Sequence, residues 1–152
     1  MSLIDITEKN CIKVDLESLD KEGVIEELVD LLVNAGKIKD KQKAIDDIME
    51  REKKGSTGLE KGIAVPHAKT EAVDKLSLAF GISKDGVDFN AMDGEYSYLI
   101  LLLLAPPGAS GPHVEALASI ARFLTPPVIR EKLKNVKSSD DIINIIIEYE
   151  NS

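Results

Sequence analysis

The chain has 152 residues, of which 43% are hydrophobic and 30% are charged, a balance ordinary for one globular domain of common size. Its net charge of −8, with 4% aromatic residues and no tryptophan, disfavours binding to nucleic acid and adhesion to an anionic membrane. The single cysteine, Cys11, excludes an internal disulfide and a CxxC metal site.

The first residues and the longest apolar run bear on location. MSLIDITEKN carries acidic side chains where a signal peptide would carry a basic region followed by an apolar run. The longest apolar run, YLILLLLA at 98–105, is far shorter than the roughly 20 residues needed to cross a bilayer. With no internal repeat and no linker, we expect a cytoplasmic protein that consists of a single domain spanning residues 1–152, without membrane insertion.

Two helices are predicted in the first third of the chain, after a weak strand candidate at Cys11–Val14. Residues 20–35 place apolar side chains at helical spacing, with Asp20 as a cap at the start and Gly36 as a stop. Residues 41–53 repeat this pattern, and Gly55 follows them.

The pattern then changes to that of short strands. Apolar runs at Ile63–Val65, Leu76–Ile82 and Tyr98–Ala105 are separated by Gly, Asp and Pro residues, and Val87–Phe89 is a weaker candidate. The run at 98–105 is apolar at every position rather than at alternate ones. It is therefore predicted to be a central strand covered on both faces.

The last third of the chain is predicted to be helical again. His113–Leu124 carries an apolar stripe, Pro127–Leu133 is a short helix, and Asp140–Tyr149 is capped by Ser139. Helices before and after a central sheet predict an α/β fold. The expected architecture is a three-layer sandwich, with a mixed sheet and helices on both faces.

The segment GIAVPHAK, residues 62–69, holds one of the two histidines of the chain. The residue before a proline is pushed toward extended geometry, so Val65 should finish a strand. Pro66 cannot donate to a sheet ladder, so pairing should weaken there and present His67 just past the strand end. A histidine in that place can be a base, a nucleophile, a metal ligand or a plain surface residue.

The second histidine is predicted at the start of a helix. In the loop PPGASGP, Ser110 or Gly111 is a plausible N-cap and Pro112 suits the first helical position. His113 would then lie in the first turn, where unpaired N–H groups and the helix dipole make a site for an anion. Both histidines are thus expected just beyond the carboxyl ends of strands.

Two histidines beside an anion site favour phosphoryl chemistry. Two histidines alone make a poor zinc site, and neither HExxH nor the GxSxG turn of a serine hydrolase is present. A neutral imidazole is nucleophilic near neutral pH and can accept a phosphoryl group. No P-loop is present, so we expect no nucleotide, metal or other cofactor.

Several segments together resemble the enzyme IIA domain, fructose/mannitol type, of the bacterial sugar phosphotransferase system. The resemblance spans nearly the whole chain and implies a sheet of five strands flanked by helices. The segments that carry it are Arg51-Glu52, Ser56-Thr57-Gly58, GIAVPHAK, Val87-Asp88-Phe89, LILLLLAPPG and PHVEALASIARFL.

The resemblance implies a phosphotransferase that works through a phosphohistidine. In this family a histidine at the position of His67 accepts phosphate from the histidine phosphocarrier protein. It passes the phosphate to a cysteine of a IIB partner, and so to a sugar that enters at the membrane IIC component. The family's second active-site histidine falls on His113 and its arginine on Arg51. Stand-alone nitrogen-type relatives instead signal phosphorylation state by binding proteins, and the motif is common to both roles.

Other interpretations of these residues stay open. Lys69 could supply a second cation and Thr57 a hydrogen bond from its loop. Arg51 suits bidentate phosphate contacts but could be a solvated helix residue, and His113 could merely cap its helix. A plain anion- or metal-binding module that uses both histidines is a further alternative. For transfer between proteins we expect a shallow surface depression with an apolar rim.

Overall fold

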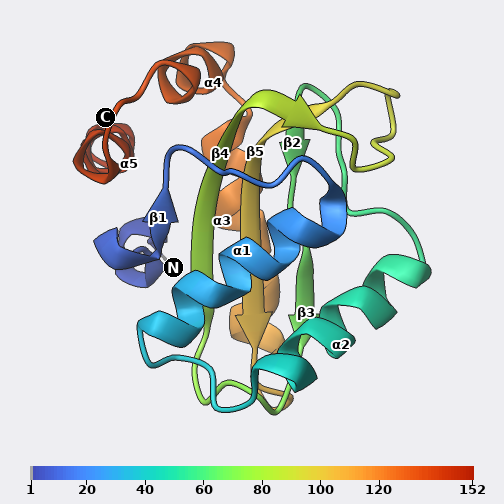
Figure 1. Cartoon of the computed structure of the whole chain (residues 1–152). Helices are drawn as coiled ribbons and strands as arrows, with labels where there is room; N and C mark the ends of the chain where they lie inside the picture. Colours follow the sequence, from blue (N-terminus) through green and yellow to red (C-terminus); the bar gives the residue numbers. More distant parts are fainter. Residues whose placement is uncertain (1) are drawn as a thin grey trace.

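The computed structural model describes residues 2–152, which form a mixed five-stranded sheet with helices on both faces (Figure 1). The sheet contains β1 (Ile12–Lys13), β4 (Ser77–Val87), β5 (Ser97–Ala105) and β2 (Ile63–Ala64), in that order. β3 (His67–Lys69) follows β2 along the same edge of β5. Only the β4–β5 pair is antiparallel among these strands; the other pairs are parallel. The predicted three-layer α/β fold is confirmed.

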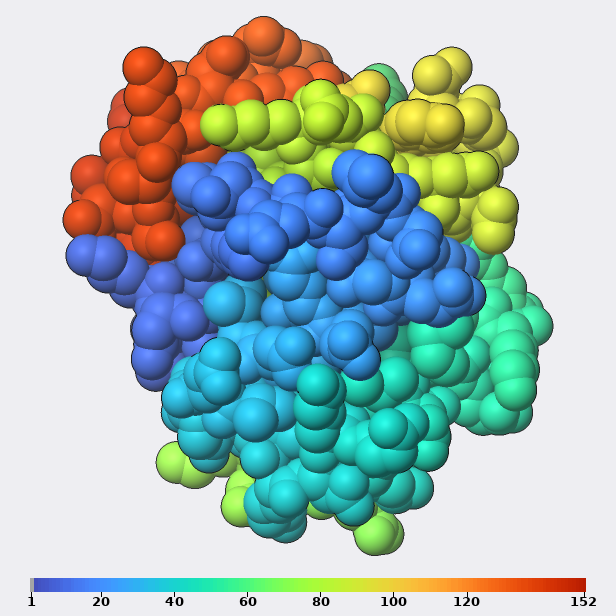
Figure 2. Space-filling model, in the orientation of Figure 1, coloured from blue at the N-terminus to red at the C-terminus, as the bar shows by residue number. Residues whose placement is uncertain are grey.

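One face of the sheet is covered by α1 (Lys21–Asn34) and α2 (Lys41–Lys53), which lie in front of it in Figure 1 and occupy the middle and lower part of the space-filling view in Figure 2. Side chains of β5 alternate between the two faces. On this face, buried residues of α1 and α2 pack with Ile100, Leu102 and Leu104.

The opposite face is covered by α3 (Ser110–Leu124), α4 (Pro127–Lys134) and α5 (Ser139–Glu150). These helices pack on the remaining β5 side chains, Leu99, Leu101 and Leu103. All six residues from Leu99 to Leu104 are fully buried. The prediction of a central strand covered on both faces is confirmed. No helix within residues 2–152 has the length and apolar character needed to span a membrane.

The first two predicted helices are confirmed with their caps. The Asp20 side chain accepts a hydrogen bond from the Gly23 N–H at 2.7 Å, and Gly36 adopts a φ of 75°, which suits glycine at a helix end. α2 spans the predicted residues. Two short 3-10 helices, η1 (Leu3–Ile6) and η2 (Lys9–Cys11), precede β1 and were not predicted.

The prediction that His67 lies past the end of a strand is wrong. Pairing does break at Val65 and Pro66, as the missing proline N–H predicts. It resumes at once, because His67 opens β3 beside Leu103 of β5. The Pro66 carbonyl still accepts a hydrogen bond from the Leu103 N–H at 2.9 Å, which keeps the two segments aligned across the break.

Other strand boundaries also differ from the predictions. Val87–Phe89 is not a strand of its own: β4 continues to Val87, which pairs with Ser97 after an irregularity in register. The candidate at Cys11–Val14 shortens to Ile12–Lys13, with Cys11 in η2.

Two helices in the last third begin elsewhere than predicted. α3 starts at Ser110, so its N-cap is Ala109 and Pro112 is the third helical residue. Proline is tolerated there because a first-turn N–H has no partner within the helix. α5 is capped by Ser138 rather than Ser139, and a capping box joins Ser138 to Asp141.

Candidate functional site

The fold brings the two histidines together at the carboxyl end of β5. His67 of β3 pairs with Leu103 near that end, and the chain turns from β5 into α3, whose fourth residue is His113. The two imidazole rings lie edge to face, with centroids 5.6 Å apart and planes inclined by 68°.

The ring of His67 is half-buried and held by one backbone contact. Its Nδ1 lies 2.7 Å from the Val65 carbonyl oxygen. A carbonyl can only accept a hydrogen bond, so Nδ1 carries the ring proton in the neutral form. Nε2 then has a free lone pair, which makes it the nucleophilic atom of the ring.

His113 is buried, with 6% of its surface exposed. Burial is the main reason that its pKa lies below the ordinary value of 6.5, and nearby positive charge on His67 and Lys69 lowers it further. Its Nε2 is buried and has no hydrogen-bond partner within the described residues 2–152. An unpaired buried polar atom is costly, so a hydrogen bond to a ligand would satisfy this nitrogen.

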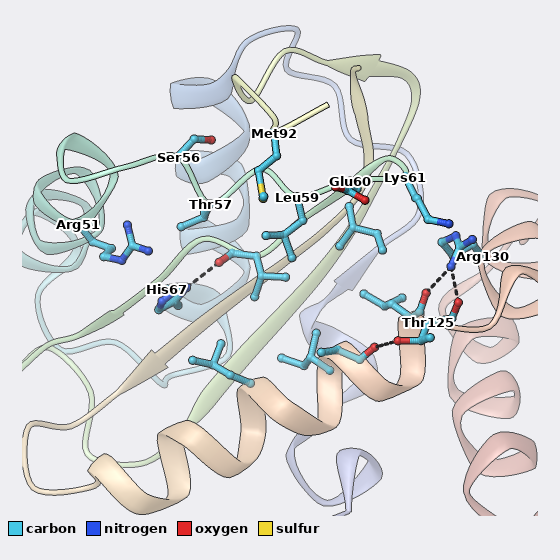
Figure 3. Close-up of a pocket in the computed structure, with 16 residues that line it drawn as sticks. Arg51, Ser56, Thr57, Leu59, Glu60, Lys61, His67, Met92, Thr125 and Arg130 are labelled. Carbon is cyan, nitrogen blue, oxygen red and sulfur yellow. Dashed lines mark hydrogen bonds between the residues drawn. The ribbon is translucent and has the colours of Figure 1, made fainter. Parts of the chain in front are cut away.

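Two cationic side chains flank His67. Arg51, in the last turn of α2, donates from Nη1 to the Gly55 carbonyl at 2.8 Å, and it lies at the same end of the site as His67 (Figure 3). Lys69 is on the same side of β3 as His67 because side chains alternate along a strand. Its Nζ donates to Ser110 Oγ at 2.6 Å, at the first residue of α3.

Thr57 makes contacts different from those expected of a phosphate ligand. It is buried, at 3% exposed, and its hydroxyl donates to the Glu52 carboxylate. Its N–H also points to Glu52, at 3.3 Å, and its carbonyl accepts from the Val65 N–H at 3.0 Å. Sequence reasoning gave Glu52 no role, because a glutamate at the end of a charged helix is usually solvated.

An elongated groove of about 540 Å³ extends away from His67 (Figure 3). Arg51 and His67 lie at one end, and Lys61 and Arg130 at the other. Most of the wall between them is apolar. The apolar residues that line it are Leu59, Ile63, Val65, Met92, Leu117, Ile120, Ala121 and Leu124.

The exposed residues of the groove and the ionisable groups around it indicate which kind of ligand it can bind. Leu59 is 39% exposed and Met92 is 74% exposed at this surface. Within residues 2–152, no group of three or more His, Cys, Asp and Glu side chains is placed to hold a metal ion. The arrangement offers one nucleophilic nitrogen, two cations and a helix N-terminus, a set suited to an anionic group.

Comparison with known proteins assigns the family. The chain matches the family described as "Phosphoenolpyruvate-dependent sugar phosphotransferase system, EIIA 2" over residues 5–149, and it belongs to that family. The resemblance seen in the sequence is thereby confirmed. The chain is a IIA domain of the fructose/mannitol type, a phosphocarrier component of a phosphotransferase system.

Two relatives act in fructose systems according to their names. The chain is 41% identical to the fructose-specific EIIABC component of Bacillus subtilis over 150 residues, covering 99% of the chain but only 24% of that protein. It is 38% identical to the fructose-specific EIIA component of Haloferax volcanii over 143 residues, covering 94% of the chain and 93% of that protein.

Solved structures share the fold. The nitrogen regulatory protein IIA-Ntr of Neisseria meningitidis superposes with a TM-score of 0.83 at 31% identity, covering 95% of this chain and 98% of that one. The IIA-mannitol enzyme of Escherichia coli, solved in complex with phosphorylated IIB-mannitol, superposes with a TM-score of 0.80 at 23% identity, covering 93% and 97%.

Proposed function

We propose that this chain carries phosphate on Nε2 of His67, accepting it from the histidine phosphocarrier protein and passing it to a cysteine of a IIB component for sugar uptake. The observation that carries the proposal is the contact between His67 Nδ1 and the Val65 carbonyl at 2.7 Å. This contact leaves Nε2 unprotonated and orients the ring before any donor arrives.

The proposed step needs no proton transfer. The Nε2 lone pair forms a bond to phosphorus while the N–P bond of the donor's phosphohistidine breaks, and the donor ring, which is protonated on its other nitrogen, leaves as a neutral imidazole. Positive charge develops on the His67 ring during the attack. The Val65 carbonyl oxygen stabilises that charge through the Nδ1–H hydrogen bond, which remains in place throughout.

The neighbouring groups would stabilise the negative charge of the phosphoryl oxygens. The N-terminus of α3, the Arg51 guanidinium and Lys69 all supply positive potential near His67. His113 would donate from its unpartnered ring nitrogen, in the tautomer that carries the proton there. These contributions are mainly positioning and electrostatic, as is general for phosphoryl transfer.

The apolar groove beside His67 fits protein partners. The phosphoryl group must pass between histidine and cysteine side chains on separate domains, so the acceptor has to be reachable from outside. Exposed Leu59 and Met92, with the apolar wall of α3 behind them, offer a surface on which a partner can bury apolar side chains. The complex of the mannitol IIA with phosphorylated IIB supports a IIB partner here.

A regulatory role is the second candidate. It is favoured by the fit to IIA-Ntr of Neisseria meningitidis, which has 31% identity and nearly full coverage. Transport is preferred because the fructose-specific relatives are more similar, at 41% and 38% identity over almost the whole chain.

The test is incubation with phosphoenolpyruvate, enzyme I and the histidine phosphocarrier protein, followed by intact mass. We expect one added phosphoryl group that is labile in acid and stable in mild base, as a phosphoramidate should be. His67→Ala should abolish the labelling. Undiminished labelling of His67→Ala would show that another residue is the acceptor. Transfer from the labelled chain to IIB domains of fructose systems, against none to others, would support the transport role over the regulatory one.

A further inference from the structure

Glu52 is a buried carboxylate beside the site that no step described so far uses. It lies in the last turn of α2 next to Arg51 and is 8% exposed. Its Oε2 is 2.6 Å from Nζ of Lys21, the first residue of α1, whose side chain is 15% exposed. The desolvation cost of a buried ion pair can exceed its Coulombic gain, so stability alone is a weak reason for this pair.

Glu52 holds Thr57 by two hydrogen bonds. The Thr57 hydroxyl donates to Oε1 and the Thr57 N–H donates to Oε2 at 3.3 Å. Both donors are buried with Thr57, so they have little access to water in place of the carboxylate. An ionised carboxylate accepts hydrogen bonds and donates none, which fixes the orientation of both groups.

Thr57 in turn holds the backbone that leads to His67. Its carbonyl accepts a hydrogen bond from the Val65 N–H at 3.0 Å, and the next residue, Gly58, forms an antiparallel bridge with Ala64. The Val65 carbonyl then accepts from His67 Nδ1 at 2.7 Å. The chain of contacts Glu52–Thr57–Val65–His67 therefore runs without a gap from the buried carboxylate to the imidazole.

The position of Val65 in the sheet explains why its backbone needs hydrogen bonds from outside the sheet. Pairing with β5 is interrupted at Val65 and Pro66, where the proline has no N–H to give. The carbonyl that orients His67 thus lies in the break between β2 and β3. The hydrogen bond from the Val65 N–H to Thr57 holds this residue from outside the sheet.

We propose that Glu52 is a positioning residue for phosphoryl transfer, which acts through Thr57 and Val65 to keep the His67 proton on Nδ1 and Nε2 free. The inference rests on the proposed role of His67. It assigns the buried Lys21–Glu52 pair a functional purpose, since Lys21 neutralises the carboxylate that holds Thr57.

The first experiment reads the ring directly. We would record the ¹⁵N chemical shifts of the His67 ring, without any phosphoryl donor, in the wild type, Glu52→Gln, Thr57→Val and Thr57→Ser. In the wild type, the neutral ring should be almost wholly the Nδ1–H tautomer. Thr57→Val keeps the shape but lacks the hydroxyl donor, so it and Glu52→Gln should shift the ring toward a mixture of tautomers. Thr57→Ser keeps the donor and should match the wild type.

The second experiment separates the chemical step from docking. Phosphate acceptance by Glu52→Gln and Thr57→Val should show a kcat roughly tenfold or more below that of the wild type, because small misplacements of a reacting group are costly. KM for the donor protein should stay within about twofold. Glu50→Gln, an exposed position on the same helix, makes the same change in charge and should behave like the wild type.

The outcomes decide the proposal. It is overturned if folded Thr57→Val keeps the wild-type tautomer and kcat, if only KM changes, or if Thr57→Ser loses as much as Thr57→Val. Should Glu52→Gln fail to fold, the two Thr57 variants and the wild-type spectrum still decide. The tautomer is measured without phosphate, so a failure of this inference is distinguishable from a failure of His67 to accept phosphate.

Discussion

His67 and His113 stand edge to face with their ring centroids 5.6 Å apart, so a positive charge on one ring opposes a positive charge on the other. His113 is the more buried of the two, and its pKa is lowered by its burial, by His67 and by Lys69. The lowered pKa therefore favours the neutral form of His113 beside the nucleophilic ring of His67. A dianionic phosphoryl group between them would reverse this bias, since it favours a protonated His113.

Replacing Arg51 by lysine should slow phosphoryl transfer without unfolding the domain. Lysine keeps the charge but loses the planar fork, which can donate to a phosphoryl oxygen and to the Gly55 carbonyl at once. We expect a loss of about tenfold or more in the single-turnover rate, measured by quenched flow with radiolabelled donor. Wild-type rates in both directions would leave Arg51 as an ordinary helix residue.

Trimming the apolar rim of the groove should weaken docking. Leu59→Ser removes a partly exposed side chain from the groove, and an apolar contact worth about 1 kcal/mol corresponds to roughly a fivefold rise in KM for the phosphocarrier protein. The control is Leu19→Ser, an 81% exposed leucine that does not line the groove. Equal KM values for both variants would place the docking surface elsewhere.

Helices whose ends and buried faces are specified by nearby residues were predicted correctly from the sequence. α1 and α2 were predicted to within a residue because Asp20, Gly36 and the helical apolar spacing act within a few residues of one another. β3 was missed because His67–Lys69 carries no apolar pattern of its own, and its pairing is set by distant β5. The start of α3 was misplaced because its N-cap is Ala109, whose methyl side chain cannot accept a capping hydrogen bond and so gives no signal in the sequence.

The two histidines of the candidate site were identified from the sequence because imidazole side chains are characteristic of phosphoryl-transfer chemistry. The sequence predicted that each histidine follows a strand, and the structure places both near the carboxyl end of β5, although His67 opens β3 instead of lying past a strand end. The network around Glu52 did not, because the burial of a glutamate depends on how α1, α2 and the loop at 55–58 pack. Nothing in the spacing of Lys21, Glu52 and Thr57 indicates that they meet.

The lowered pKa of His113 should make the folded state sensitive to mild acid. The unfolded chain binds a proton at His113 near pH 6.5 and the folded protein only below that value. The free energy of unfolding should therefore fall as the pH drops through about 6.5, because the unfolded state binds more protons in that window. We expect His113→Gln to show a shallower fall between about pH 7.5 and about pH 5 in urea titrations.

A second variant that lacks an imidazole at the same end of the sheet, His67→Gln, provides the control for that measurement. This variant keeps the buried His113, so its free energy of unfolding should still fall more steeply with falling pH than that of His113→Gln. Parallel stability curves for the wild type and His113→Gln would show that burial does not hold His113 neutral.

The last prediction separates the roles of the two histidines. His67 is proposed to bond to phosphorus, whereas His113 is proposed only to hydrogen-bond near it, so His113→Ala should still accept phosphate but pass it to the IIB cysteine more slowly. Loss of one positioned donor to developing charge commonly costs roughly a hundredfold in rate, and less where water can enter. Single-turnover labelling and onward transfer of His67→Ala and His113→Ala, run side by side, measure both steps. Labelling of His67→Ala but not of His113→Ala would reverse the two roles, and wild-type behaviour of His113→Ala at both steps would remove His113 from the mechanism.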